Sequence, residues 1–393
     1  MEAVVLDKPR QIGIETIAEP ALLAPADVLL RLTSTAICGT DLHIYEGRLG
    51  GGQRIVIGHE PLGVVERVGT GVVNVRVGDR VTVPTHICCG FCPNCVHGYS
   101  AQCLTTNPGK AGAAYGYPGM GGYTGAQTQL LRVPFGDANC LRLPGQPGDR
   151  WEHDFVLLAD ALPTAFHATE LAGVRTGDIV VIYGAGAIGL LTAMCAFMRG
   201  ALQVFVVDAI PERLDKAGEL GAQPIDMRDG DTVERILEQI ARQRSGIAWR
   251  GEEANLGATV CIDAIGFQAR EPHDYSVENP TAVIDDLARL VAPKGRLSII
   301  GVFLDSDPSA RGEAAQHGNY VIPWGTLFKK GVTIGMGRDD DKNYNDHLRD
   351  AIVSGRIKPG TIVSHRLPLR DAPDAFAKFD ARSDGYIKVV LEP

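Results

Sequence analysis

Four cysteines stand close together in the segment CGFCPNCVHGYSAQC, where Cys89, Cys92 and Cys95 are two residues apart and Cys103 follows after a seven-residue gap. Four thiolates with short spacers containing Gly and Pro can converge on one tetrahedral ion, at about 2.3 Å from zinc. The spacing therefore predicts a structural zinc site, which has no open coordination position and performs no chemistry. The alternative is a disulfide cluster or a set of buried thiols. Cys88 adjoins Cys89 and could compete for its place.

A second, open metal site is predicted from Cys38 in ICGTDLH and His59 in IGHEPLG, each of which stands where a short strand meets a turn. An open zinc site takes three protein ligands and leaves the fourth position to water or substrate. Asp160 in LLADALPTAFH is the candidate third ligand, because a thiolate and a carboxylate together cancel the charge of the ion. Taken alone, Asp160 could equally be a helix N-cap. Three neighbouring residues are also of types that can bind a metal and are therefore alternatives to Asp160: Glu152, His153 and Asp154.

Three more residues near these ligands could handle a proton. A cation stabilises an alkoxide, so an alcohol beside it loses its proton more readily. Thr40 offers a hydroxyl two residues after Cys38, and His43 offers an imidazole three residues later, which predicts a proton route through the ribose of a cofactor. The alternative for His43 is an ordinary surface histidine. Glu60, beside His59, is placed to tune the ion or briefly to replace its water.

A glycine-rich turn predicts a dinucleotide site. The sequence GAGAIG follows an apolar run over residues 179–183 and precedes the helical run LLTAMCAFM. In such a turn the first glycine permits the tight bend, the second lets the backbone approach a pyrophosphate, and the third allows close packing of helix on strand. The alternative is a glycine turn without a ligand. The predicted contacts are Gly184, Gly186, Ala187, Ile188 and Gly189.

An acid at the end of the next apolar run, QVFVVD, strengthens this prediction. The carboxylate of Asp208 can accept hydrogen bonds from both adenosine ribose hydroxyls and would repel a 2′-phosphate, which favours NAD over NADP. Arg213 lies nearby and is expected to pack over the adenosine. Further contacts are predicted after the following two strands, at the sheet edge where ligands bind: Asp263, Gly266 and Val302.

The pattern of apolar and polar residues along the chain predicts which secondary structures position these residues. A length of 393 residues favours two domains. Residues 1–160 carry short alternating runs such as GVVERVG, which are typical of small antiparallel strands, and this texture returns after about residue 337. Between them, continuous Val/Ile runs alternate with helical segments and predict a doubly wound parallel sheet. The prediction is an α/β protein with a mostly-β catalytic domain, 1–160 and 338–393, and a nucleotide domain, 161–337.

The composition favours small-molecule partners. The formal charge of −9 and the absence of a clustered basic stretch argue against binding of nucleic acid or of an acidic membrane surface. We find neither an apolar run long enough to span a bilayer nor an N-terminal leader, and we expect a cytoplasmic protein. The cysteines outside the two predicted sites are scattered singly, which fits a reducing compartment.

In their order and approximate spacing, CGTDLH, GHE, the four-cysteine segment and GAGAIG resemble the zinc-dependent medium-chain alcohol dehydrogenases, over essentially the whole chain. Within that family the chain looks most like the glutathione-independent formaldehyde dehydrogenase and aldehyde dismutase group. The stretches that carry this likeness are KAGAAYGYPGMGGYTGAQ, LLADALPTAFHA and GFQAREPHDYSVENPTA.

The resemblance implies a GroES-like fold for the β-rich domain and a Rossmann fold for the nucleotide domain. It also implies a catalytic zinc on Cys38, His59 and Asp160, a proton relay through Thr40 and His43, two zinc ions per chain, and NAD. The implied reaction is hydride transfer between NAD and a primary alcohol or hydrated aldehyde, in a homodimer or homotetramer. The alternatives are a secondary-alcohol or polyol dehydrogenase of the same fold and a noncatalytic NAD-binding redox sensor.

Two stretches bear on the substrate and on the retention of the cofactor. In the group that the chain resembles, an added segment corresponding to residues 267–279 lies over the adenosine end of the cofactor and would slow NAD release. Its alternative is a flexible surface loop. The stretch IPWGTLFKKGVTIGMGRDD departs from that group in a region that helps to line the substrate pocket.

Overall fold

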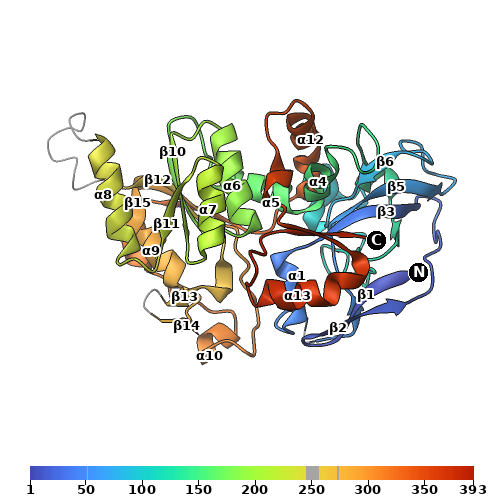
Figure 1. The fold of residues 1–393 in the computed structure, drawn as a ribbon, viewed down its shortest axis with the longest axis horizontal. Coiled ribbons are helices and arrows are strands. Elements are labelled where there is room, and N and C mark those ends of the chain that lie inside the picture. Colours follow the sequence, from blue (N-terminus) through green and yellow to red (C-terminus); the bar gives the residue numbers. More distant parts are fainter. Residues whose placement is uncertain (51, 245–255, 272–273) are drawn as a thin grey trace. The chain divides into compact units, whose positions relative to one another are not determined.

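The computed structural model describes residues 1–50, 52–244, 256–271 and 274–393, and the chain forms two compact units (Figure 1). One unit combines Met1–Pro163 with Asp339–Pro393, and the other is Thr164–Arg338. The first unit is therefore built from two chain segments that the second unit separates. In the described part of the chain, no helix combines the length and the apolar content that crossing a membrane requires.

The first unit is rich in short strands. A seven-stranded sheet has the order β17-β18-β3-β5-β6-β8 with β7 paired to β3, and a three-stranded sheet has the order β2-β1-β4. Neighbouring strands are antiparallel except β17 and β18, which are parallel. Their bounds are β1 Glu2–Lys8, β2 Gln11–Thr16, β3 Val28–Ile37, β4 Ile55–Val56, β5 Pro61–Val68, β6 Arg80–Thr82, β7 Leu130–Val133, β8 Leu141–Arg142, β17 His365–Pro368 and β18 Val389–Glu392. The predicted small antiparallel strands are confirmed.

Two apolar clusters form the interior of this unit. In one, Ile37 and Val389 pack with Phe376 of a C-terminal helix. In the other, Leu30 and Val81 pack with the buried ring of Tyr115. The helices are α1 Gly39–Tyr45, α2 Pro93–Val96, α3 Gly136–Asn139, α4 Glu152–Phe155, α12 Asn345–Val353 and α13 Ala372–Asp380, while α5 Ala161–Leu171 runs from this unit into the next.

The second unit contains a six-stranded sheet of order β11-β10-β9-β12-β15-β16, in which every neighbouring pair is parallel. The strands are β9 Ile179–Tyr183, β10 Gln203–Asp208, β11 Gln223–Asp226, β12 Ala258–Asp263, β15 Val291–Ile299 and β16 Thr333–Met336. All five residues of β9 are buried, because a strand in the middle of such a sheet is covered on both faces. The predicted α/β architecture with a parallel nucleotide-binding sheet is confirmed.

Helices follow the strands of this sheet, as the alternating texture predicts (Figure 1). In α8, Val233, Ile236 and Ile240 recur at helical spacing and are buried against the sheet. The helices are α6 Ala187–Met198, α7 Pro211–Glu219, α8 Thr232–Arg244, α9 Ala282–Leu290, α10 Glu313–Gln316 and α11 Trp324–Lys330. Strand order reverses between β9 and β12, and ligands bind at the carboxyl ends of strands where such a reversal occurs.

The segment predicted to lie over the cofactor contains a short antiparallel ribbon. Its strands are β13 Arg270–Glu271 and β14 Asp274–Glu278. The position of this segment over the cofactor, and the alternative of a flexible surface loop, stay predictions. Residues 272 and 273 lie outside the described residues.

Candidate active site

Four residues that are distant in sequence gather in the β-rich unit: Cys38, His59, Glu60 and Asp160. Cys38 follows β3 and caps α1, His59 and Glu60 precede β5, and Asp160 directly precedes α5. One ligand-type atom from each lies within 4.8 Å of the others. The four residues are 6%, 0%, 0% and 8% exposed in that order. The cluster is therefore closed to bulk water on almost every side.

The spacing of the donor atoms suits a shared ion. Asp160 Oδ2 lies 3.4 Å from Cys38 Sγ and 3.4 Å from His59 Nε2. Two ligand atoms bound to one tetrahedral zinc ion are about 3.3 to 3.7 Å apart. Within the described residues, His59 Nε2 is buried and makes no hydrogen bond. A thiolate, an imidazole and a carboxylate are also the donor types that zinc accepts, so these residues fit a zinc ion.

The charges of the cluster favour the binding of a cation among its side chains. Burial, and then the neighbouring Asp160 carboxylate, raise the pKa of the Cys38 thiol. Burial alone would raise the pKa of Asp160, but the adjacent His59 ring lowers it below its ordinary range. For His59, burial disfavours the imidazolium, yet Asp41 and other neighbours raise its pKa well above the usual value. A divalent cation would balance the thiolate and the carboxylate.

Asp41 holds the ligand loop in place, and the sequence reasoning missed it. Its Oδ2 accepts a hydrogen bond of 3.0 Å from the Cys38 backbone N–H, and its Oδ1 lies 3.0 Å from His59 Nδ1. The carboxylate thereby fixes the imidazole so that Nε2 faces Asp160, as carboxylates behind histidine ligands do. The available signal was an acid at the third position of the helix that Cys38 caps, where it completes a capping box.

Lys388 is a second residue that the sequence did not indicate. Its Nζ donates hydrogen bonds to Glu60 Oε1 at 2.6 Å and to the Ile37 carbonyl oxygen at 3.2 Å. Burial raises the pKa of Glu60 to about 7, although Lys388 opposes the shift. The only hint in the sequence is a lysine inside the apolar run YIKVVL. Lys388 directly precedes the last strand, β18, and thus links it to β3, the strand that ends at Ile37.

The two predicted proton-relay residues, Thr40 and His43, lie on α1. Residues three apart in a helix share a face, so the hydroxyl and the imidazole stand on the same side of α1. Thr40 Oγ1 lies 3.7 Å from Cys38 Sγ. His43 is buried, so the alternative of an ordinary surface histidine does not describe it.

Two of the three competitors for the third ligand position, Glu152 and Asp154, are engaged elsewhere. Glu152 accepts a hydrogen bond of 2.7 Å from the Thr33 hydroxyl and forms an ion pair with Arg80. Asp154 accepts a hydrogen bond of 2.7 Å from the backbone N–H of Gly360. Neither they nor His153 belong to the cluster that Asp160 joins.

The four predicted thiols Cys89, Cys92, Cys95 and Cys103 form a second cluster. Cys92 Sγ lies 3.4 Å from Cys95 Sγ and 3.9 Å from Cys103 Sγ, and Cys89 Sγ lies 3.9 Å from Cys95 Sγ. Four sulfurs around a tetrahedral zinc ion are about 3.8 Å apart, whereas a disulfide requires about 2.05 Å. All nine cysteines are free, which argues against the disulfide alternative. Cys88 stands outside the cluster.

Cys88 remains a buried thiol with a partner of its own. Its Sγ donates to Asn139 Oδ1 at 3.3 Å, and burial raises its pKa to about 11. Within the four-cysteine cluster, burial would raise the pKa of Cys92, but backbone and thiol donors lower it to about 6. Burial, together with hydrogen bonds to neighbouring thiols, raises the pKa of Cys95, so the first thiolate of the cluster is favoured at Cys92, whereas a thiolate at Cys88 is disfavoured.

In the second unit, the glycine turn connects β9 to α6. Gly184 has φ +100°, and a Cβ at Gly189 would lie 1.7 Å from the Gly184 carbonyl oxygen, so helix and strand can approach only with glycine there. A Cβ at Gly186 would meet nothing closer than Arg213 Nη1 at 3.8 Å. The fold thus needs Gly184 and Gly189, and the space at Gly186 is open to a ligand. Ala187 and Ile188 begin α6.

Asp208 lies at the carboxyl end of β10, against this turn. Its Oδ2 accepts a hydrogen bond of 2.7 Å from the Ala185 N–H, and its Oδ1 accepts one of 2.7 Å from the Ala209 N–H. Oδ1 also accepts a hydrogen bond of 3.0 Å from the Ile210 N–H, so Oδ2 is the oxygen that keeps a lone pair for a ribose hydroxyl. The remaining predicted contacts also gather: Gly266 follows the buried Asp263, and a Cβ on Gly266 would lie 2.3 Å from the Val302 carbonyl oxygen.

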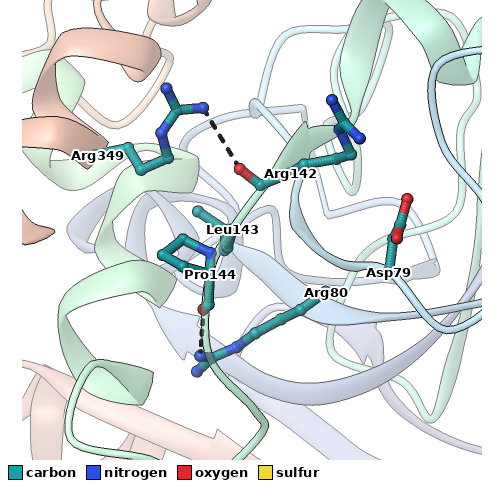
Figure 2. Close-up of a pocket in the computed structure, with 6 residues that line it drawn as sticks. All are labelled: Asp79, Arg80, Arg142, Leu143, Pro144 and Arg349. Carbon is teal, nitrogen blue, oxygen red and sulfur yellow. Dashed lines mark hydrogen bonds between the residues drawn. The ribbon is translucent and has the colours of Figure 1, made fainter.

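A surface pocket of about 390 Å³ in the β-rich unit contains none of the predicted site residues (Figure 2). Arg349 donates to the Arg142 carbonyl oxygen at 3.4 Å, and Arg80 donates to the Pro144 carbonyl oxygen at 3.2 Å. The guanidinium of Arg80 also pairs with Asp149 at 3.0 Å. Because the buried Arg80 guanidinium is already paired with protein groups, we assign no ligand to this pocket. Its lining consists of Asp79, Arg80, Arg142, Leu143, Pro144 and Arg349.

Comparison with known proteins places the chain and its fold in one family. Residues 24–145 match the alcohol dehydrogenase GroES-like domain, and residues 187–339 match the zinc-binding dehydrogenase domain. The chain belongs to the zinc-type medium-chain alcohol dehydrogenases, a family of oxidoreductases with zinc and nicotinamide cofactors.

Individual relatives refine this placement. The chain is 36% identical to the glutathione-independent formaldehyde dehydrogenase of Pseudomonas aeruginosa (strain LESB58), over 96% of this chain and 94% of the relative. It is 33% identical to the formaldehyde dismutase of Pseudomonas putida, over 100% of this chain and 97% of the relative. Among solved structures, the alcohol dehydrogenase TADH from Thermus sp. ATN1 superposes with a TM-score of 0.82 at 31% identity, covering 100% of this chain and 99% of that one.

Proposed function

We propose that the protein is a zinc-dependent, NAD-linked oxidoreductase that transfers hydride between the nicotinamide and a primary alcohol or a hydrated aldehyde. The observation that carries the proposal is the buried cluster of Cys38, His59 and Asp160, with 3.4 Å between its donor atoms. The names of the relatives from Pseudomonas aeruginosa and Pseudomonas putida support an aldehyde or its hydrate as substrate.

In this proposal the three residues hold a zinc ion that, when bound, supplies a Lewis acid and lowers the pKa of an alcohol hydroxyl. Thr40 Oγ1 would accept the proton of the substrate hydroxyl while releasing its own proton, and the imidazole of His43 would take up a proton from this route and give it to solvent. Asp41 orients His59, while Glu60, held by Lys388, adjusts the charge beside the ligands. The four-cysteine cluster holds a second, structural zinc ion.

We also propose that the two compact units are the functional domains, with the NAD site on residues Thr164–Arg338 and the metal sites on the other unit. The glycine turn at the start of α6 would hold the pyrophosphate, Asp208 would accept a hydrogen bond from the ribose, and Arg213 would pack over the adenosine. Asp263, Gly266 and Val302, at the carboxyl edge of the sheet, would contact the cofactor as well. The carboxylate at position 208 would select NAD over NADP, because a 2′-phosphate would meet negative charge.

A homodimer or homotetramer is also proposed. Strand β16 forms one edge of the six-stranded sheet, and Trp324, Phe328 and Met336 in and near it expose large apolar side chains. An apolar sheet edge favours pairing with another chain. Light scattering on the purified protein measures the mass, and Phe328→Glu should shift that mass toward the monomer.

The activity is tested by following NADH absorbance with formaldehyde, ethanol and a secondary alcohol such as 2-propanol. We expect turnover of the aldehyde or the primary alcohol, abolished in Cys38→Ser and retained in Cys140→Ser, which removes a thiol outside both cysteine-containing clusters. A preference for 2-propanol would support a secondary-alcohol dehydrogenase. No turnover of any substrate by protein with its zinc bound would support a noncatalytic sensor.

Retention of the cofactor is tested separately. Purified protein is denatured without added cofactor, and the released nucleotide is quantified by chromatography. One NAD per chain favours a dismutase-like cycle in which the cofactor stays bound. Its absence favours an ordinary dehydrogenase that exchanges NAD for NADH.

A further inference from the structure

A third group of ligand-type side chains lies in the β-rich unit and consists of His86, Asp339 and Asp341. One atom from each lies within 4.8 Å of the other two. The three residues are 7%, 3% and 0% exposed. His86 follows β6, and the two aspartates lie where the chain returns to this unit after β16. None of them belongs to the catalytic cluster or to the four-cysteine cluster.

The geometry of this group suits an ion. His86 Nδ1 and Asp341 Oδ2 form a hydrogen bond of 3.0 Å, and this separation also matches the distance of about 3.0 Å between two ligands at right angles on one ion about 2.1 Å away. The backbone N–H of His86 also donates to Asp341 Oδ2 at 3.1 Å and fixes the carboxylate beside the ring. A preformed pair of donors thus stands next to Asp339.

Two oxygens of this group lack partners. Among the residues that the structure describes, Asp341 Oδ1 and Asp339 Oδ2 are buried and accept no hydrogen bond. Leaving buried polar oxygens unsatisfied is unfavourable, and buried unpaired charge is more so. A cation between the two carboxylates and the imidazole would satisfy both oxygens at once.

The charges lead to the same conclusion. Burial, followed by the neighbouring carboxylate of Asp341, raises the pKa of Asp339 well above its ordinary value. Burial likewise raises the pKa of Asp341 to about 7, and the Asp160 carboxylate adds to the shift. A divalent cation would balance the charge of the two carboxylates.

We propose that His86, Asp339 and Asp341 bind a third divalent cation. One imidazole and two carboxylates suit a first-row ion such as Zn²⁺ or Mn²⁺, with the remaining coordination positions filled by water. The inference does not depend on the proposed dehydrogenase activity, since none of the three residues takes part in that mechanism.

The surroundings of the group assign a structural role to this ion. Asp340 Oδ1 accepts a hydrogen bond of 2.8 Å from the Ala101 N–H, and Asn343 Nδ2 donates to the Gly98 carbonyl oxygen at 2.7 Å. Both contacts fasten the returning segment to the four-cysteine region. The ion would add a stronger link, from the same segment to His86 at the entrance of that region.

The test counts metal in the full-length protein. Each protein is incubated with a small excess of Zn²⁺, dialysed against metal-free buffer and analysed by inductively coupled plasma mass spectrometry. We expect three zinc ions per chain in the wild type and two in Asp339→Asn. The matched control is Asp340→Asn, which removes the charge of the next residue but keeps an oxygen to accept the Ala101 hydrogen bond, and which should retain three.

A second variant and a second measurement keep the test decisive. If Asp339→Asn does not fold, His86→Gln removes the nitrogen ligand instead and should also hold two ions. Zinc added to metal-stripped protein should raise the melting temperature less in these variants than in the wild type. Cys38→Ser separates the sites, because it should lose activity and the catalytic ion while the third ion stays.

Two results would overturn the proposal. One is a wild-type count of two ions per chain that Asp339→Asn leaves unchanged, as expected if the two carboxyls only share a proton. The other is an equal loss of zinc in Asp340→Asn, which would trace the effect to the fold of the segment. Failure of the dehydrogenase assay alone would leave these counts unaffected.

Discussion

The buried ion pair between Lys388 and Glu60 leads to a sharp prediction about stability. Lys388 is 1% exposed and Glu60 is 0% exposed, and the Nζ to Oε1 distance is 2.6 Å. Lys388→Met preserves the length of the aliphatic stem but removes the ammonium. The variant leaves the Glu60 carboxylate without its cation and the Ile37 carbonyl oxygen without a donor.

Removing one partner of a buried ion pair destabilises a protein by about 3 to 5 kcal/mol. The pKa of Glu60 is already raised by burial to about 7 in spite of Lys388. Without the ammonium the pKa rises further, so Glu60 takes up a proton at neutral pH and part of the penalty disappears. We therefore expect a loss of about 3 kcal/mol, at the lower end of that range.

A double-mutant cycle separates the pair from other effects of the substitution. Glu60→Gln combined with Lys388→Met leaves no unpaired charge, so the double variant should lose less stability than the sum of the two single variants, with a coupling of about 2 kcal/mol. Stability is measured by urea denaturation followed by circular dichroism at pH 7. The control is Lys378→Met, which removes a partly exposed lysine paired with Asp374 on the surface and should change stability by less than about 1 kcal/mol.

Two outcomes would refute this reasoning. The first is a loss below about 1 kcal/mol in Lys388→Met, which is the size typical of an exposed pair. The second is strict additivity in the cycle, which would mean that Lys388 stabilises the fold through its packing and its bond to Ile37 rather than through Glu60.

Three further predictions concern other parts of the chain. Gly189→Ala would place a Cβ 1.7 Å from the Gly184 carbonyl oxygen, so we expect unstable protein that fails to bind NAD in calorimetry. Cys92→Ser removes one of four clustered thiols and should lose one zinc ion per chain by metal analysis, with a lower melting temperature. Glu152→Gln weakens a buried pair with Arg80 and should lose about 2 kcal/mol in urea at neutral pH. Although burial opposes the shift, hydrogen bonds lower the pKa of Glu152 below 4.5, so its stabilisation is complete above pH 4.5 and fades as the pH falls through the folded-state pKa.

Each of these predictions has a matched control. Gly186→Ala meets no close atom, so it should fold normally yet bind NAD more weakly. Cys88→Ser removes the neighbouring thiol outside the cluster and should keep the full zinc content. Glu212→Gln, on the surface of α7, should lose no stability at any pH. Normal folding of Gly189→Ala, an unchanged zinc count in Cys92→Ser, or a Glu152→Gln deficit that persists in strong acid would contradict the respective argument.

Local residue spacing was enough to predict those parts of the molecule that form within one short segment of the chain. The four cysteines lie within one short segment, and the glycines of the turn are bracketed by a strand and a helix, so their geometry follows from the backbone between them. The same holds for the alternation of apolar strands and helices, which predicted the parallel sheet. Short-range patterns suffice here because few backbone conformations connect such closely spaced residues.

The rest of the site depends on strand order and register. Val389 pairs with Ile37, which brings Lys388 to the end of the strand that leads into Cys38, although the two positions are far apart along the chain. The third ligand candidate, Asp160, was singled out by family likeness. Residue spacing alone did not distinguish between a metal ligand and a helix N-cap at this position. Its 3.4 Å distances to Cys38 and His59 exist only once the sheet has formed.

The sequence by itself therefore predicted a thiolate-bound metal and a bound dinucleotide, because the motifs for both are local. Only the tertiary structure decided which charges meet. Asp41 behind His59, Lys388 on Glu60, and His86 beside Asp339 and Asp341 are pairings between distant segments. Burial makes each of them strong, and burial is a property of the folded chain that no run of residues specifies alone.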